Sequence, residues 1–249
     1  MSSLESWDIA IVGGGPAGST AASVLKTYNP DLNVIVLEQS EFPRDHVGES
    51  QLPPIGPILA EIGVWEKVEA ADFPIKIGAS YTWGREEGRW DFDFYPIENW
   101  EDEPRPAKYE GQRRFTAFQV DRAIYDKILL DHSEELGTVV RQNTRVRKVL
   151  TEGDRIEGLQ LDNGDVITAR HYIDASGVTA LFRRALGIGS DEPEKLRNIA
   201  IWDYWENADW AVEIGVGATR VQVRSLPWGW IWFIPLGPTR TSIGLICPN

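Results

Sequence analysis

Two short apolar runs with a stretch of small residues between them open the chain. Asp8–Val12 and Asn33–Leu37 are predicted to be strands, because each is a short, mainly apolar run. Pro16–Thr27, rich in small residues, is predicted to form a helix. The order strand, helix, strand indicates an α/β fold.

The middle of the chain combines a helical pattern with a series of alternating segments. Residues 115–136 place Ile124, Ile128 and Leu129 at helical spacing after Asp121, which is expected to be the N-cap. Residues 144–177 then alternate as strands, with turn signals at Glu152–Asp154 and Asn163–Gly164.

Two further regions alternate aromatic and polar residues. The stretch ASYTWGREEGRWDFDFY at 79–95 predicts an antiparallel hairpin around an Arg-Glu-Glu-Gly turn. Its aromatic face would hold Tyr81, Trp83, Trp90, Phe92 and Phe94. After Gly189 the predicted strands are 198–205, 219–226, 228–237 and 238–245, with the last two forming a hairpin.

The segment WGWIWFIP at 228–235 concentrates three tryptophans at every second position. Side chains two apart on a strand share a face, so an apolar wall is expected from Trp228, Trp230, Trp232 and Ile234. Periodicity alone favours ordinary core packing. An antiparallel sheet with an aromatic face is also a suitable substrate chamber, so the rest of the sequence has to decide.

Composition narrows the function classes. The 249 residues carry a formal net charge of −13, which argues against nucleic acid or an anionic membrane as partner. No apolar run reaches the ~18 residues of a membrane span, and no signal peptide is evident at the start, so we expect a cytoplasmic protein. The single Cys247 excludes an internal disulfide and a cysteine-rich metal cluster, and no metal is expected.

A nucleotide-binding fingerprint lies between the first strand and the first helix. Gly13, Gly15 and Gly18 have G-x-G-x-x-G spacing, and Glu38 ends the second strand. The glycines allow a tight turn, close approach of a pyrophosphate and close helix packing, while the helix N-terminus attracts phosphate. Glu38 would accept hydrogen bonds from a ribose and would disfavour a 2′-phosphate. The ligand is therefore expected to be FAD or NAD.

The segment EFPRDHVGES at 41–50 resembles the loop after the second strand in flavoproteins of one superfamily, which includes aromatic hydroxylases, geranylgeranyl reductases and flavin-dependent halogenases. The resemblance implies FAD as the cofactor. It also implies that four residues of this loop lie along the flavin: Arg44, Gly48, Glu49 and Ser50.

Two later segments resemble parts of the same fold. Residues 120–129 are similar to the superfamily's V-x-R-x-x-(F/Y)-D-x-x-L helix, whose arginine reaches the flavin linker, here Arg122. YIDASG at 172–177 is similar to a strand end beneath the cofactor, which implies roles for Asp174 and Gly177. The region 144–146 resembles the adenine-side strand.

The fold expected from these matches is α/β, with an FAD-binding Rossmann-like domain of the glutathione-reductase/hydroxylase type and an inserted antiparallel substrate sheet. The discontinuous FAD-binding domain would comprise 1–75 and 112–190. The substrate region would comprise 76–111 and 191–249.

Two motifs resemble those of the flavin-dependent halogenases. Residues 230–235 spell W-x-W-x-I-P, although geranylgeranyl reductases carry a related aromatic-x-W-x-F-P. FPIKIG at 73–78, followed by Trp83-Gly84, is similar to the halogenase segment that carries the essential lysine, here Lys76. Its place between Ile75 and Ile77, at the edge of the aromatic hairpin, favours a desolvated functional amine over a solvated charge.

The halogenase resemblance implies a mechanism. FADH2 from a separate flavin reductase reacts with O2 to give a flavin hydroperoxide, a halide attacks it, and Lys76 delivers the hypohalous acid. The expected substrate is a phenolic, pyrrolic or carrier-bound aromatic. A partition between flavin and substrate would consist of Trp230, Trp232, Ile234 and Pro235.

Two alternatives stay open. One is a flavin monooxygenase or a geranylgeranyl-reductase-like oxidoreductase, which the setting of Lys76 argues against. The other is an inactive FAD-binding remnant, because the G-D segment that such flavoproteins carry at the flavin ribityl and pyrophosphate does not follow Trp232. For the same reason we expect a chain truncated at its C-terminus, with its halide site and any acid partner of Lys76 in the part that is missing.

Overall fold

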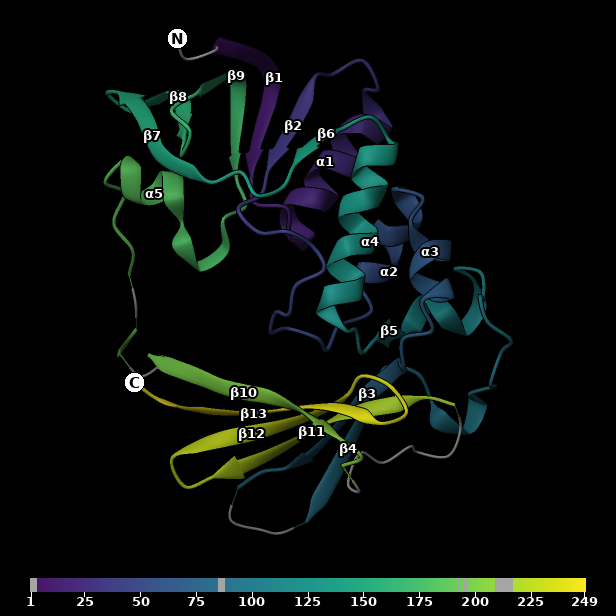
Figure 1. The fold of residues 1–249 in the computed structure, drawn as a ribbon. Helices are drawn as coiled ribbons and strands as arrows, with labels where there is room; N and C mark the ends of the chain where they lie inside the picture. The colour runs from purple at the N-terminus through teal and green to yellow at the C-terminus, as the bar shows by residue number, and fades with distance from the viewer. Residues whose placement is uncertain (1–3, 85–87, 192, 195–196, 209–216) are drawn as a thin grey trace. The chain divides into compact units, whose positions relative to one another are not determined.

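The computed structural model describes residues 4–84, 88–191, 193–194, 197–208 and 217–249 (Figure 1). The chain forms two compact units. The first consists of Met1–Arg44 and Ala123–Asp191, and the second of Asp45–Arg122 and Glu192–Asn249. No helix in the described ranges is long and apolar enough to cross a membrane.

The first unit is built on a six-stranded mixed sheet. Its parallel part consists of β6 (Val139–Arg141), β2 (Val34–Leu37), β1 (Leu4–Val12) and β9 (Val166–Asp174), in that order. The antiparallel strands β8 (Arg155–Leu161) and β7 (Val146–Glu152) extend it beyond β9. The predicted strands and both predicted turns are confirmed.

The helices of this unit cover the sheet according to the alternation of its strands. Side chains of α1 (Pro16–Tyr28) and α4 (Arg122–Glu135) pack with Ile9, Ile11, Val34 and Val36, and both helices lie at one side of the sheet in Figure 1. The alternate residues Ala10, Val12, Ile35 and Leu37 pack with β7, β8 and α5 (Leu181–Ala185). A short 3₁₀ helix, η3 (Gly177–Thr179), precedes α5.

The predicted helix at 122 is confirmed, but its buried face differs from the expected one. Ile124 is 49% exposed, whereas Tyr125, Leu129 and Leu130 are buried. A helix turns by about 100° per residue, so Tyr125 and Leu129 share the buried face and Ile124 lies off it.

The second unit is built on a seven-stranded sheet. Its order is β10 (Asn198–Glu206), β13 (Arg240–Pro248), β12 (Gly229–Pro235), β11 (Thr219–Leu226), β3 (Ile75–Thr82) and β4 (Arg89–Asp93). β5 (Ala117–Phe118) pairs with β3 outside this path. β11 and β3 are parallel and the other pairs are antiparallel.

Four short helical segments accompany this sheet. They are α2 (Ile55–Glu61), α3 (Trp65–Ala70), η1 (Ile97–Asn99) and η2 (Gly111–Phe115). Every predicted strand after Gly189 is present, and β12 and β13 form the expected hairpin. Together the two sheets confirm the mixed α/β class.

The aromatic hairpin is also present. β3 and β4 pair antiparallel, and the Tyr81 and Trp90 rings stack with centroids 4.5 Å apart. Trp90 and Phe92 share their face of the sheet with Tyr81 but are about half exposed. Of the expected Arg-Glu-Glu-Gly turn at 85–88, residues 85–87 lie outside the described residues.

The compact units divide the chain at different points from the predicted domains. Residues 45–75 and 112–122 fall in the second unit. Backbone pairing explains this, because β5 pairs with β3 and Ser50 forms a bridge with Gln119. The predicted domain boundaries themselves stay a prediction.

The tryptophan wall is shorter than predicted. Trp228 lies in the tight β11–β12 turn and is exposed, because Leu226 and Gly229 already pair across the hairpin. Trp230 and Trp232 share one face, with ring centroids 5.9 Å apart, and Trp232 is buried.

Gly244 makes room for the Trp232 indole. It is the cross-strand partner of Trp232 on β13, and a Cβ at this position would clash with the six-membered ring of the indole. The indole is also fixed by a hydrogen bond of 3.1 Å from its Nε1 to Ser242 Oγ.

We expect Gly244→Ala to lower the free energy of unfolding by about 1–3 kcal/mol, because the added methyl overpacks a buried contact. Urea unfolding followed by tryptophan fluorescence measures this. Gly237→Ala, in the turn of the same hairpin, is the control, because a Cβ there meets nothing within 4 Å. Equal stability of the two variants would contradict the account of Gly244.

Candidate functional site

Two of the fingerprint glycines are required by close backbone packing. Gly13 has φ +105°, and a Cβ on it would clash with the carbonyl of Ala175. A Cβ on Gly18 would clash with the carbonyl of Gly13. Gly13 lies in the turn between β1 and α1, and Gly18 lies in the first turn of α1 that packs on it, so their first role is structural.

Gly15 is different, because no contact in the described part of the chain requires a glycine there. Its φ of −66° suits any residue, and a Cβ would approach only Arg44 Nη2, at 3.4 Å. Gly15 is also the N-cap of α1, which has no side-chain cap and no acid in its first turn. Unpaired N–H groups at the start of a helix, with open space and a guanidinium nearby, suit a phosphate.

Arg44 is held at this turn from two sides. Its Nη1 lies 3.4 Å from a carboxylate oxygen of Asp126 on α4, and its guanidinium lies 4.5 Å from the centroid of the Phe42 ring. The structure thus places Arg44 beside the fingerprint, close to the helix N-terminus.

Glu38 is buried at the end of β2, and both of its oxygens accept backbone hydrogen bonds. Gly14 N donates to Oε2 at 2.7 Å and Ser40 N donates to Oε1 at 2.8 Å. An ionised carboxylate has about four acceptor positions, so it can also accept hydrogen bonds from a ribose. The backbone of the predicted adenine-side strand is adjacent, since Thr144 N donates to Glu38 O at 2.8 Å.

The end of β9 lies against the fingerprint turn. Ala175 N donates to Val12 O at 2.9 Å, next to the contact with Gly13. The Asp174 carboxylate accepts from Ser176 N at 3.0 Å and from Phe182 N at 2.7 Å, so it fixes its own loop and the start of α5. Gly177 is exposed, with φ +61°. The first unit therefore brings together all its predicted cofactor residues except Gly177, which follows on the same loop.

The remaining predicted flavin residues lie in the second unit. Arg122 is buried, unlike an ordinary first-turn arginine, and its Nη1 donates to Val47 O at 2.8 Å and to Gly48 O at 3.3 Å. Glu49 is also buried and accepts from Gly48 N at 2.9 Å. These contacts hold the G-E-S loop against Arg122 within the second unit.

The tryptophan wall packs with the same loop. Val47 belongs to the apolar cluster of Trp230, Trp232 and Ile234, and Pro235 is buried at the end of β12. The Tyr204 hydroxyl lies 3.5 Å from Glu49 Oε1. The pKa of Tyr204 is raised, mainly because the side chain is buried and also because the Glu49 carboxylate is negatively charged. Within the second unit, the W-x-W-x-I-P strand and the G-E-S loop are therefore neighbours.

Lys76 is buried in the middle of the second unit. Its side chain is 3% exposed, and its Nζ donates to Gln51 O at 2.7 Å and lies 5.4 Å from the centroid of the Phe94 ring. Burial lowers the pKa of Lys76 to about 8. The amine therefore exists in both protonation states near neutral pH.

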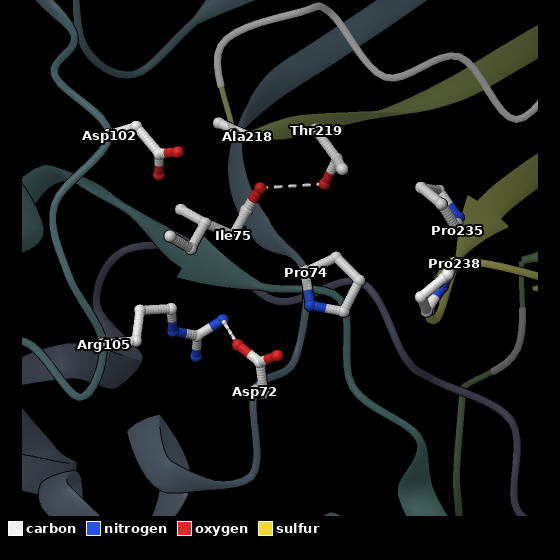
Figure 2. Close-up of a pocket in the computed structure, with 11 residues that line it drawn as sticks. Asp72, Pro74, Ile75, Asp102, Arg105, Ala218, Thr219, Pro235 and Pro238 are labelled. Carbon is white, nitrogen blue, oxygen red and sulfur yellow. Dashed lines mark hydrogen bonds and ion pairs between the residues drawn. The ribbon is translucent and has the colours of Figure 1, made fainter.

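A cavity of about 290 Å³ lies elsewhere in this unit (Figure 2). It is lined by Pro74, Ile75, Ala218, Thr219 and Pro235 among others, and Lys76 does not line it. Figure 2 shows Arg105 directed at Asp72, at 3.0 Å, and Thr219 Oγ1 at the Ile75 carbonyl, at 2.8 Å.

Arg105, the cationic side chain named in this cavity lining, already pairs with protein groups. Arg105 also donates to Glu69 Oε2 at 3.1 Å and Phe73 O at 2.5 Å, and burial lowers its pKa. Glu69 in turn pairs with the buried Arg113. The cavity thus adjoins a structural ion-pair network.

Sequence reasoning missed residues whose partners are distant in the chain. Arg240 lies 3.9 Å from the centroid of the Tyr204 ring and pairs with Asp121 at 2.6 Å. Glu69, Arg105 and Arg113 were missed for the same reason. Gln119 was missed as well, although a glutamine between Phe118 and Val120 is an interruption that the sequence shows.

Comparison with known proteins gives one consistent family. A family profile described as tryptophan halogenase matches residues 8–103 and 99–247. A 1H-pyrrole-2-carbonyl-[peptidyl-carrier protein] chlorinase of Pseudomonas fluorescens is 37% identical over 96% of this chain and 55% of its own length. A tryptophan 2-halogenase of Chondromyces crocatus is 32% identical over 97% of this chain and 43% of its own length.

The solved structures agree with this result. The FAD-dependent myxobacterial chondrochloren halogenase superposes with a TM-score of 0.83 at 33% identity, over 98% of this chain and 53% of the other. This likeness confirms the expected Rossmann-like FAD-binding architecture. The chain spans about half the length of the relatives that it matches.

We expect Lys76→Met to raise the free energy of unfolding by about 1–3 kcal/mol at pH 7. Below pH 8 the folded protein keeps a charged amine that burial disfavours, since the pKa falls from 10.5 to about 8. Between pH 8 and 10.5 the unfolded chain binds more protons, so the penalty fades as the pH rises. The advantage of Lys76→Met should therefore shrink towards pH 10.

Urea unfolding at pH 7 and pH 9.5 measures both effects. Lys127→Met is the matched control, because Lys127 is partly exposed and pairs with Asp131 at 2.7 Å, so its loss should change stability by less than about 1 kcal/mol. A Lys76→Met protein less stable than wild type at pH 7 would show that the lysine is a structural requirement.

Proposed function

The chain belongs to the tryptophan halogenase family, and on this basis we propose that it is part of an FADH2-dependent halogenase that delivers hypohalous acid through Lys76. The observation that carries the proposal is the buried amine of Lys76, with a pKa of about 8, in the unit that also holds the G-E-S loop and the tryptophan wall. An ordinary surface lysine has neither property.

FAD fits the residues of the first unit. The α1 N-terminus and Arg44 would hold the pyrophosphate, and Glu38 would hold the adenosine ribose. Gly48, Glu49, Ser50, Arg122, Asp174 and Gly177 are proposed to line the rest of the cofactor. When reduced by a separate flavin reductase, the bound cofactor and O2 supply the oxidising equivalents that convert a halide ion into hypohalous acid.

Lys76 then binds the hypohalous acid and transfers its halogen. Its amine holds hypohalous acid by a hydrogen bond or reacts with it, forming an N–halogen bond and releasing water. The substrate carbon takes the halogen from nitrogen and loses its proton, which restores the amine. A pKa near 8 favours this, because an appreciable fraction of the amine is neutral at physiological pH.

The tryptophan wall is proposed to keep this chemistry dry. Trp230, Trp232 and Ile234 form an apolar cluster with Val47, next to the G-E-S loop, and the buried Pro235 ends the strand. Exclusion of water prevents loss of a reactive oxidant by side reactions.

The substrate class is proposed to be pyrrolic, phenolic or carrier-bound. A relative named as a chlorinase of a carrier-bound pyrrole is 37% identical to this chain, and one named as a brominase of a carrier-bound pyrrole is 27% identical. These names support an electron-rich aromatic as the substrate.

Gly15→Val is expected to weaken FAD binding at least tenfold with little loss of stability. The side chain would occupy the space assigned to the pyrophosphate, while the fold has room for it. Isothermal titration with FAD and thermal unfolding measure the two effects. Gly18→Val is the contrasting variant and should unfold the β1–α1 turn, because its Cβ meets backbone. Unchanged FAD affinity in Gly15→Val would overturn the pyrophosphate assignment.

In a turnover assay, Lys76→Ala is expected to abolish halogenation while flavin oxidation continues. Anaerobically reduced FAD is mixed with oxygen, bromide and either phenols or a carrier-bound pyrrole, and products are identified by mass spectrometry. Wild type should give brominated product, with at least a 100-fold loss in Lys76→Ala and none in Lys127→Ala. Hydroxylated product would favour a monooxygenase, and failure to retain FAD would favour an inactive remnant.

A further inference from the structure

Three side chains share one face of a small antiparallel arrangement around β5. Lys76 pairs with Ala117, Gln119 N donates to Pro74 O at 2.9 Å, and Ser50 bridges to Gln119. Residues directly opposite on antiparallel strands point to the same face, and residues two apart do so as well. Lys76, Gln119 and Ser50 therefore lie on one face.

One small side chain and one backbone carbonyl connect Lys76 with the Ser50 segment. The methyl group of Ala117 is the side chain next to Lys76, and the Lys76 amine reaches beyond it to Gln51 O, at 2.7 Å. Gln51 follows Ser50 directly, so the amine ends beside the segment that carries Ser50. This placement puts a primary amine, a carboxamide and a hydroxyl on one face of neighbouring strands.

Gln119 is fully buried, at 0% exposure, but its amide is unpaired. Within the described part of the chain, neither its Nε2 nor its Oε1 has a hydrogen-bond partner, and neither does the buried Ser50 Oγ. Most buried polar groups in proteins are paired, because a buried group without a partner has lost its hydrogen bonds to water. Within the described residues, nothing satisfies the polar atoms of this face.

Gln112 provides a direct comparison. It is also a buried glutamine of the second unit, but its Oε1 accepts from Glu101 N at 3.0 Å and its Nε2 donates to Glu101 O. Both amide atoms of Gln112 are thus paired, whereas among the described residues neither amide atom of Gln119, on the face of Lys76, has a partner. This difference points to a ligand at Gln119.

The chemistry of the groups restricts the ligand. The carboxamide has a donor and an acceptor, so its partner must both accept and donate a hydrogen bond. A halide ion can only accept, whereas a small hydroxylic molecule can do both. Hypohalous acid has an O–H donor, oxygen lone pairs and a halogen at the other end.

We propose that Gln119 and Ser50 form, with Lys76, a binding site for hypohalous acid, an inference that rests on the proposed function. Gln119 and Ser50 bind the oxygen end, which leaves the halogen available to the amine. The N–halogen bond forms as the O–halogen bond breaks, and the oxygen leaves as water with one amine proton. Gln119 and Ser50 are thus oxidant-binding residues, in addition to Lys76.

The test needs no flavin. The protein, in a Cys247→Ala background that removes its one thiol, is treated with one equivalent of hypochlorous acid, and the chlorinated lysines are identified by peptide mass spectrometry. We expect Lys76 to be chlorinated in preference to the more exposed Lys127. Gln119→Leu and Ser50→Ala should lower chlorination of Lys76 about tenfold, whereas Gln112→Leu should not.

Thermal unfolding of the same variants separates this role from a structural one. Gln119→Leu should keep or raise the melting temperature, because it replaces an unpaired buried amide by an apolar side chain of similar size. Gln112→Leu should lower it, because two paired backbone groups of Glu101 lose their partners. A lower melting temperature in Gln119→Leu would show that its amide is structural and would overturn the proposal.

The other outcomes are equally decisive. If Gln119→Leu is stable but Lys76 is chlorinated as in wild type, the amide serves only a buried water and the proposal fails. If Lys76 is chlorinated no faster than Lys127 in wild type, the proposal also fails, even where turnover halogenation depends on Lys76. If chlorination depends on Gln119 but turnover gives no halogenated product, the binding site stands and the proposed function fails.

Discussion

The desolvation of one lysine is the constraint that organises the second unit. A buried amine is stable only where the surrounding strands provide a polar contact and little steric conflict. Gln51 O provides that contact, and Ala117 leaves the path to it open. The lowered pKa of Lys76 follows directly, so the cost to stability and the reactivity that we propose for the amine have the same origin.

The first unit is subject to a different constraint, which is the close approach of backbone segments around Gly13 and Gly18. Gly13 and Gly18 are fixed by contacts within the β1–α1 turn, and any sequence with this turn needs them. Gly15 has no such contact among the described residues, and the space beside it is the space that we propose for the pyrophosphate. A glycine fingerprint therefore combines positions needed for folding with a position that is informative about binding, and the structure distinguishes the two.

Much of the fold could be predicted from the sequence, because strands and turns depend on local patterns. The β1–α1–β2 order, the β12–β13 hairpin and the buried setting of Lys76 all follow from short stretches. Long-range pairing could not be predicted. The ion pair of Glu69 with Arg113 and the bridge of Ser50 with Gln119 join segments far apart in the chain, and no local periodicity encodes them.

The same limit explains why the side chains around Lys76 were harder to identify than Lys76 itself. The lysine stands in a recognisable sequence segment. Gln119, in contrast, is connected with Lys76 only through the pairing of β5 with β3 and with the Ser50 segment. An unpaired buried amide costs stability, and an apolar residue would remove that cost. A buried glutamine on the face of a desolvated amine is therefore what the proposed oxidant site requires, because folding alone would favour the apolar residue.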